Sequence, residues 1–262
     1  MSLIVRLASL NDAKEITEVH CSDVTEWFRY EAGRRVKAGY GELSVEERFL
    51  HGGPWMSVET CAVHLNYVLS SGQYPLVAVL DGRVVGELEL YVGGERGLLD
   101  EAGFIDVLVV HSQYRRRGVG RALVREAGEI ACEKGCGTLS VWPEKDAVVF
   151  YRKCGLDKVA YRVAHVVVKP GARVQGYETQ VFPENYDDLR DMLFISPRMK
   201  TGFTAWLKSM WPIAVETGRA IHERGTVTDL DMAYIMERLP GGEACVTLWV
   251  RDKEAVPRPW HG

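Results

Sequence analysis

The sequence predicts a mixed α+β fold with two domains, at residues 1–170 and, smaller and also α+β, at residues 171–262. Short β-branched runs of strand length alternate with segments of helical periodicity along the chain. Asp81-Gly82 joins two such runs and supplies the positive φ angles of a tight hairpin turn, which predicts antiparallel strands. Pro170-Gly171 interrupts the pattern and marks the expected domain boundary.

Each element of the first domain follows from a local pattern. We expect strands at 3–8, 75–80, 83–92, 104–110, 138–142 and 159–168. We expect helices from an N-cap at Asn11-Asp12 to His20, and at 121–134 and 146–153. The segment 21–70 is rich in aromatic and charged residues and is interrupted by glycines near 39–41 and 52–53, so we expect two or three helices there.

The second domain combines helices with a hairpin. We expect a strand at 177–181, a helix beginning at Pro183 and a Trp-rich helical stretch at 203–223. A hairpin of 231–238 with 244–251 is predicted around Pro240-Gly241-Gly242.

Composition excludes several classes of protein. The 262 residues are 47% hydrophobic and 26% charged, which argues against disorder. The net charge of −4 gives no basic excess for binding nucleic acid. No apolar run approaches the roughly 18 residues of a membrane span, and residues 1–10 lack a signal-peptide pattern. The six cysteines form no C-x-x-C pairs. We therefore expect a cytoplasmic protein with reduced thiols that binds no metal, nucleic acid or membrane.

A basic, glycine-containing loop lies between the expected strand 104–110 and the helix that follows. Its sequence is Arg115-Arg116-Arg117-Gly118-Val119-Gly120-Arg121. The first N–H groups of a helix have no intrahelical partner and carry partial positive charge, so this loop predicts a phosphate site. A P-loop is excluded because no Gly-Lys is followed by Ser or Thr, and Leu123 replaces the third glycine of a dinucleotide fingerprint. A solvated connecting loop is the alternative.

This loop resembles the R/Q-x-x-G-x-G/A motif of the GNAT superfamily, the acetyl-CoA-dependent N-acetyltransferases. A second segment, Ala147-Val148-Val149-Phe150-Tyr151-Arg152-Lys153-Cys154-Gly155-Leu156, is similar to the A-x-x-F/L-Y-x-x-x-G-F segment of that family, with Leu156 in place of the terminal aromatic residue. The resemblance covers residues 3–168 and leaves the C-terminal 90 or so outside.

The resemblance implies a central, mostly antiparallel sheet flanked by helices, whose fourth strand (104–110) splays from the fifth (138–142) to admit the pantetheine of acetyl-CoA. It implies transfer of the acetyl group to a primary amine of a small molecule or protein. The implied cofactor-binding residues are Leu108, Val109, Val110, Arg115, Arg116, Arg117, Gly118, Val119, Gly120 and Arg121.

The resemblance also suggests the catalytic residues. Tyr151 holds the family position of the general acid that protonates the departing thiolate. Asp106 is our first choice for the acceptor of the amine proton, because it interrupts an apolar strand at the same parity as Leu108 and Val110. A purely structural Asp106, satisfied by nearby donors, carries equal weight. Glu87, Glu89 or a water chain are the reserve candidates.

Other features leave alternatives open. Glu144 stands where many family members have an Asn that contacts the cofactor, and it either repels the cofactor or attracts a cationic amine. His111 is expected to cap the chain or contact phosphate. The aromatic residues of 21–70, together with Trp206, Trp211, Trp249 and Trp260, either line an acceptor cleft or pack in cores. A homodimer is left open, and so is a catalytically weak acetyl-CoA sensor whose effector is the C-terminal domain.

Overall fold

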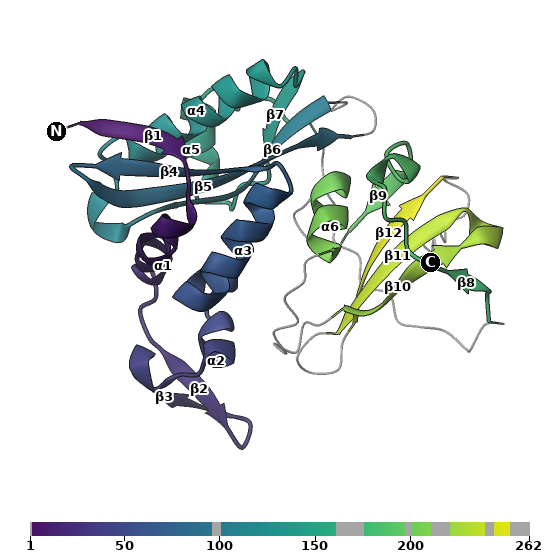
Figure 1. The fold of residues 1–262 in the computed structure, drawn as a ribbon, viewed down its shortest axis with the longest axis horizontal. Coiled ribbons are helices and arrows are strands. Elements are labelled where there is room, and N and C mark those ends of the chain that lie inside the picture. The colour runs from purple at the N-terminus through teal and green to yellow at the C-terminus, as the bar shows by residue number, and fades with distance from the viewer. Residues whose placement is uncertain are drawn as a thin grey trace. The chain divides into compact units, whose positions relative to one another are not determined.

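The computed structural model describes residues 2–95, 101–160, 176–196, 201–210, 221–238 and 244–251 (Figure 1). These residues form two compact units. Unit 1 contains 2–92 and 102–156, and unit 2 contains the other described residues, including 93–95 and 101. The predicted boundary at Pro170-Gly171 and all but the first two residues of the predicted strand 159–168 lie outside the described residues.

Unit 1 is built on a five-stranded sheet in the order β1-β4-β5-β6-β7. Its strands are β1 (Leu3–Leu7), β4 (Tyr74–Leu80), β5 (Arg83–Gly94), β6 (Glu101–Val110) and β7 (Thr138–Val141). β1 and β5 both pair antiparallel with β4, and β7 pairs parallel with β6. Asp81 and Gly82 have φ angles of 49° and 82°, which confirms the predicted hairpin turn. The mixed, mostly antiparallel sheet confirms the predicted fold class.

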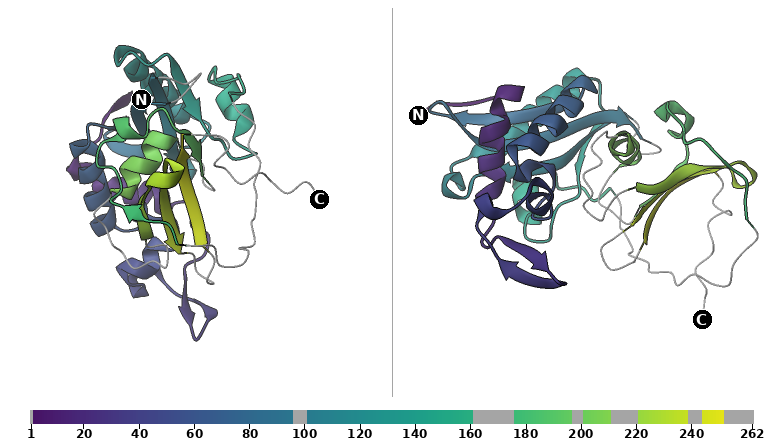
Figure 2. Two further views of the ribbon diagram at one scale, coloured as in Figure 1. Left: turned by 90° about the vertical axis from the view of Figure 1, so that its right-hand side faces the viewer. Right: turned by 60° about the horizontal axis from the view of Figure 1, so that its bottom comes forward.

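Helices cover both faces of this sheet (Figure 2). On one face, α1 (Ala13–Cys21) and α3 (Val58–Ser70) pack against Val77 and Val84. On the other, α4 (Val119–Glu133) and α5 (Val148–Lys153) pack against Leu76, Ala78 and Leu88. Neighbouring residues of a strand point to opposite faces, so the continuous apolar run of β4 serves both layers.

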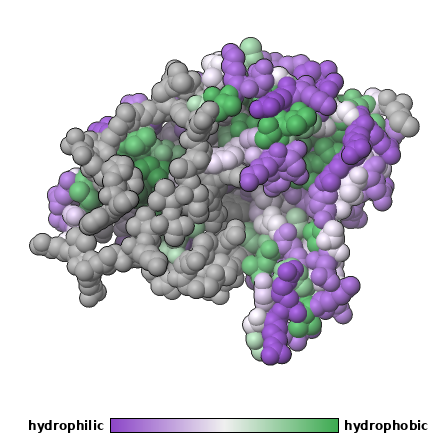
Figure 3. Space-filling model, turned by 180° about the vertical axis from the view of Figure 1, so that it is seen from behind, coloured by the Kyte–Doolittle hydropathy of each residue, from purple (hydrophilic) through white to green (hydrophobic). Residues whose placement is uncertain are grey.

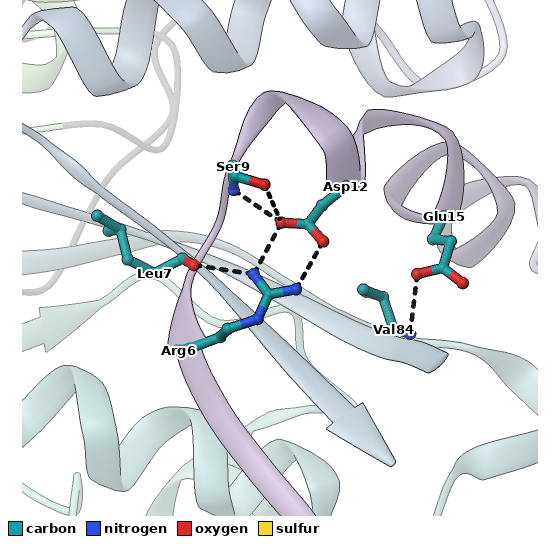
Figure 4. Close-up of polar contacts among 6 residues, drawn as sticks. All are labelled: Arg6, Leu7, Ser9, Asp12, Glu15 and Val84. Atoms are coloured by element: carbon teal, nitrogen blue, oxygen red, sulfur yellow. Dashed lines mark hydrogen bonds and ion pairs between the residues drawn. The ribbon is translucent and has the colours of Figure 1, made fainter. Parts of the chain in front are cut away.

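Asp12 fixes the connection between β1 and α1 (Figure 4). Its carboxylate accepts two hydrogen bonds from the Arg6 guanidinium, at 2.7 and 2.8 Å, and two from the N–H and hydroxyl of Ser9, at 2.7 and 3.0 Å. Burial raises the pKa of the Asp12 carboxyl, but these hydrogen bonds outweigh burial and hold the pKa below its usual value. Glu15 accepts from the N–H of Val84 at 3.2 Å and so anchors α1 to β5.

The expectation of helices alone in 21–70 is wrong in part. This segment begins with a hairpin of β2 (Phe28–Glu31) and β3 (Arg34–Lys37), followed by α2 (Val45–Phe49) and α3. Ala32 and Gly33 form the turn with φ angles of 48° and 77°, the left-handed pair that a two-residue hairpin requires. The projecting hairpin carries mostly hydrophilic side chains (Figure 3).

Unit 2 contains a second antiparallel sheet in the order β8-β10-β11-β12-β9 and the helix α6 (Gly202–Ser209). Its strands are β8 (Thr179–Gln180), β9 (Leu193–Ile195), β10 (Ile221–Val227), β11 (Met232–Arg238) and β12 (Ala244–Val250). The β11–β12 hairpin confirms the prediction. The helix predicted at Pro183 is wrong, because only a short 3-10 turn forms at Tyr186–Asp188 before β9. The predicted helix 203–223 is too long, since α6 ends at Ser209 and β10 begins at Ile221.

The described tryptophans of unit 2 are core residues. Trp249 is fully buried against Phe182 and Phe194. Trp206 packs on the same core and donates from its indole N–H to the Pro183 carbonyl at 3.0 Å. Packing is therefore the role of these two rings, whereas Trp211 and Trp260 lie outside the described residues.

Candidate active site

The two parallel strands of unit 1 separate in the middle of β6. β6 and β7 are paired over four residues each, beginning with Ala102 opposite Thr138 and ending with Ile105 opposite Val141, where β7 ends. β6 continues for five more residues, so within the described sheet its main chain from Asp106 to Val110 has no partner in β7. This is the splay that the resemblance implies. It leaves the peptide groups of Leu108–Val110 without a partner in β7, and of these the Val110 carbonyl accepts from Arg115.

The loop after β6 turns the chain into α4 with two left-handed residues. Arg116 has a φ of 61° and Gly118 a φ of 84°, and no side chain caps the first N–H groups of α4. A Cβ at Gly118 would meet no atom within 4 Å, whereas a Cβ at Gly120 would lie 3.1 Å from the Phe150 ring. Glycine therefore permits the left-handed φ at 118 and allows α5 to pack closely at 120. The first N–H groups of α4 therefore have no side-chain partner, which is the arrangement that anion binding at a helix N-terminus requires.

Arg115, one of the loop arginines expected to bind the cofactor, has two partners within the protein. Its guanidinium forms an ion pair with Asp23 and donates to the Val110 carbonyl at 3.1 Å. The N–H of Ser112 donates to the Ser22 hydroxyl at 3.0 Å, so two contacts join the loop to the segment after α1. Arg115 therefore positions the loop, and the remaining exposed arginines are Arg116, Arg117 and Arg121.

His111 caps the short 3-10 turn at Ser112–Tyr114, and capping was one of the two roles expected for it. Its Nδ1 accepts from the N–H of Gln113 at 3.3 Å, and its ring packs edge to face on Tyr114.

Tyr151 lies in α5, buried in the core on the α4 side of the sheet. Burial raises the pKa of its phenol to about 12, with smaller contributions from Cys154 and Glu144. The phenol is therefore protonated at neutral pH, as a general acid must be before it acts. The adjacent Phe150 packs at Gly120, which places α5 beside the first turn of α4.

Asp106 is half-buried. It follows Ile105, which packs on the α4 side, so strand alternation places Asp106 on the α1–α3 side of the sheet. Burial raises the pKa of Tyr91 well above its usual value, and the charges of Glu89, Asp106 and Glu87 raise it further. These acids therefore share the surroundings of one phenol. The expectation that Asp106 lies on the same face of the strand as Leu108 and Val110 is wrong. Those two residues pack on the α4 side, as Ile105 does, so the alternation of faces shifts by one residue within β6, as at a β-bulge.

A buried polar network lies on this face of β5. The Glu87 and Glu89 side chains are each 1% exposed. Glu87 is hydrogen-bonded to His20 of α1, with 2.9 Å between Oε2 and Nε2. Glu89 is bonded to His64 of α3, to the indole N–H of Trp55 at 3.0 Å and to the Tyr91 hydroxyl at 2.7 Å. The His20 ring stacks on Trp55, with ring centroids 5.0 Å apart and an interplanar angle of 6°.

Sequence reasoning named both glutamates as reserve candidates but missed their partners. A signal existed. The helical period that buries Ile16 and Val19 also turns His20 toward the sheet, and His64 lies one turn from the buried Cys61 and next to Leu65. Nothing in the sequence, however, pairs one histidine with one strand position.

Two further findings concern the described part of the chain. No group of three or more His, Cys, Asp or Glu side chains there is arranged to hold a metal ion. None of the helices described is long and apolar enough to span a membrane.

Comparison with known proteins assigns a family to part of unit 1. Residues 42–156 match the family model of the acetyltransferase (GNAT) family. No curated protein matches the chain in sequence. Among solved structures, an acetyltransferase from Trypanosoma brucei is 21% identical with a TM-score of 0.45, covering 64% of this chain and 100% of its own. Glucosamine-6-phosphate N-acetyltransferase from Arabidopsis thaliana is 18% identical with a TM-score of 0.44, covering 63% and 97%. An aminoglycoside N-acetyltransferase in complex with CoA is 11% identical with a TM-score of 0.45, covering 66% and 96%.

Residues 42–156 are therefore a GNAT acetyltransferase domain. Members of this family transfer an acetyl group from acetyl-CoA. The domain fits that cosubstrate, because an open glycine turn precedes uncapped N–H groups at α4 and the adjoining edge of β6 is unpaired.

Proposed function

We propose that this protein transfers the acetyl group of acetyl-CoA to a primary amine of a small molecule or a protein, by direct attack of the amine on the thioester. The observation that carries the proposal is the continuity between the unpaired edge of β6 and the uncapped N-terminus of α4. The N–H groups at 116–121 would hold the pyrophosphate, and the main chain of Leu108, Val109 and Val110 would pair with the pantetheine amides. Arg116, Arg117 and Arg121 add charge at the same place.

Tyr151 and Asp106 supply the proton transfers in this proposal. Tyr151 would give its proton to the departing thiolate, which is supported by a phenol that burial keeps protonated. Asp106 would take the proton of the attacking amine, since it is the carboxylate on the strand whose edge the pantetheine would occupy. In this proposal Tyr151 acts from the α4 side of the sheet and Asp106 from the other side.

The test is release of CoA thiol when the protein is incubated with acetyl-CoA and a panel of small amines and peptides with free N-termini. We expect release that depends on one class of amine and equals the acetylated product by mass spectrometry. If the protein binds acetyl-CoA but none of the amines causes release of CoA thiol, the result would instead support the alternative, a catalytically weak acetyl-CoA sensor.

A further inference from the structure

We propose that His20 and Glu87 share one proton and are the final destination of the proton that leaves the acceptor amine. This inference rests on the proposed acetyl transfer. It assigns separate roles to the two buried glutamates of β5, which the sequence could not distinguish.

Glu89 is held as a fixed anion. Its two oxygens accept hydrogen bonds from the His64 ring, the Trp55 indole and the Tyr91 hydroxyl, and an indole N–H and a neutral phenol facing a carboxylate act as donors. Three donors satisfy an ionised carboxylate even where it is buried. Protonating Glu89 would remove an acceptor site from this network, so Glu89 serves to position Trp55 and Tyr91.

Glu87 is in a different situation. In the part of the chain that the structure describes, its carboxylate has one hydrogen-bond partner, the His20 ring. Burial raises the pKa of Glu87, the hydrogen bond and charge of His20 lower it, and the negative charge of Glu89 raises it. One proton on the His20–Glu87 pair leaves the pair without net charge, which a buried site favours. Among the described residues, the other titratable groups near this pair are Cys21 of α1, Cys61 and His64 of α3, Tyr91 of β5 and Asp106 of β6.

The reaction balances with this pair as the proton store. The C–N bond forms and the thioester C–S bond breaks, while the proton of Tyr151 passes to the thiolate. The amine proton passes to Asp106 and then to the His20 imidazole, whose charge Glu87 compensates. An imidazole suits this role because its ordinary pKa lies near neutral pH, where a carboxylic acid holds a proton poorly. Return of that proton to the Tyr151 phenolate through solvent restores the starting state.

The test compares kcat/KM against pH for His20→Asn and Glu87→Gln with the wild type, using the amine identified by thiol release. Glu87→Gln removes the charge that favours the protonated imidazole, so the acidic limb should move to lower pH. His20→Asn should abolish that limb and lower kcat/KM about 100-fold at neutral pH. The matched control is His51→Asn, whose ring instead contacts the Phe28 carbonyl at 2.9 Å, and it should keep the wild-type limb. Glu89→Gln should move the limb less than Glu87→Gln does, because Glu89 acts on the pair through its charge and makes no hydrogen bond to His20. The proposal would be overturned if the acidic limb of the kcat/KM profile lay at the same pH in the wild type, His20→Asn and Glu87→Gln. It would also be overturned if Glu89→Gln moved this limb as far as Glu87→Gln does.

A second readout needs no acceptor. The NMR signal of the His20 ring should titrate in the protein without cosubstrate, with its midpoint at lower pH in Glu87→Gln and unchanged in His51→Asn. A midpoint that Glu87→Gln does not move would overturn the shared proton. A wild type that titrates in this way but transfers no acetyl group would overturn the proposed function, and the catalytic role of the pair with it.

Discussion

Asp23 and Arg115 form an ion pair that joins the chain after α1 to the loop before α4. Arg115 also donates to the Val110 carbonyl at the end of β6, so one guanidinium connects the splayed strand, the loop and the first helix. The first residue of the R/Q-x-x-G-x-G/A motif therefore holds the loop in position.

The first prediction concerns this ion pair. Asp23→Ala and Arg115→Ala should each weaken CoA binding, by up to about fivefold, because an exposed ion pair contributes about 0.2–1 kcal/mol. The double variant should be no weaker than the worse single variant, since both changes break the same contact. Calorimetric titration with CoA measures this, with Arg125→Ala on the outer surface of α4 as the control. A large loss in Arg115→Ala alone would show that Arg115 contacts the cofactor directly.

The second prediction concerns Tyr151. Tyr151→Phe keeps the buried ring and removes only the proton donor, so kcat should fall about 100-fold while CoA affinity changes little. Because burial raises the pKa of the phenol to about 12, ionisation of Tyr151 should cause no loss of wild-type activity between pH 7 and pH 10. Equal turnover of the two proteins would remove Tyr151 from the mechanism.

The third prediction concerns Asp12 and pH. The pKa of Asp12 is lower in the folded protein than in the unfolded chain, so its contribution to stability is present above the unfolded value of about 4 and is lost as pH falls through the folded value. Asp12→Asn should cost about 1–3 kcal/mol at pH 7, the range for lost hydrogen bonds to a charged group, and less below pH 4. Urea unfolding at both pH values measures this difference. A cost that stays constant with pH would show that the charge of Asp12 is immaterial.

The fourth prediction compares two glycines in helices. A Cβ at Gly202 would lie 2.8 Å from the Tyr186 hydroxyl and 3.3 Å from the Trp249 indole nitrogen, so Gly202→Ala should destabilise unit 2 by about 1–3 kcal/mol. A Cβ at Gly128 in α4 would make only ordinary contact with Leu139, at 3.8 Å, so Gly128→Ala should stabilise unit 1 by about 0.5–1 kcal/mol. Thermal unfolding of the two variants should shift in opposite directions. Shifts of the same sign would contradict the packing described at one of the two sites.

Features that are determined by residues close together in the sequence could be predicted. The Asp81-Gly82 hairpin and the loop from Arg115 to Gly120 depend on neighbouring residues, because positive φ angles and helix N-termini are local properties. The Ala32-Gly33 turn uses the same backbone geometry, but alanine rarely adopts a left-handed φ, and the hairpin was missed.

Features that depend on contacts between distant residues could not be predicted. The pairing of His20 with Glu87 joins residues 67 positions apart and follows from how α1 lies on the sheet. The face of the sheet on which Asp106 lies was predicted from the alternation of side chains along a strand. A one-residue shift within β6 moves the predicted side chain to the opposite face. Asp23 gave no sequence signal that it would bind Arg115.

The most direct test of the central claim is the thermal stabilisation of Gly118→Asp and Gly118→Ala by CoA. Both variants place a side chain at a φ of 84°, where Ala is strained at least as much as Asp, but only Asp adds a negative charge at the N–H groups of α4. A ligand that binds the folded state raises the melting temperature in proportion to RT ln(1 + [L]/Kd). We predict that CoA stabilises the wild type and Gly118→Ala but gives no shift in Gly118→Asp. An equal shift in all three proteins would contradict the assignment of this loop as the phosphate site.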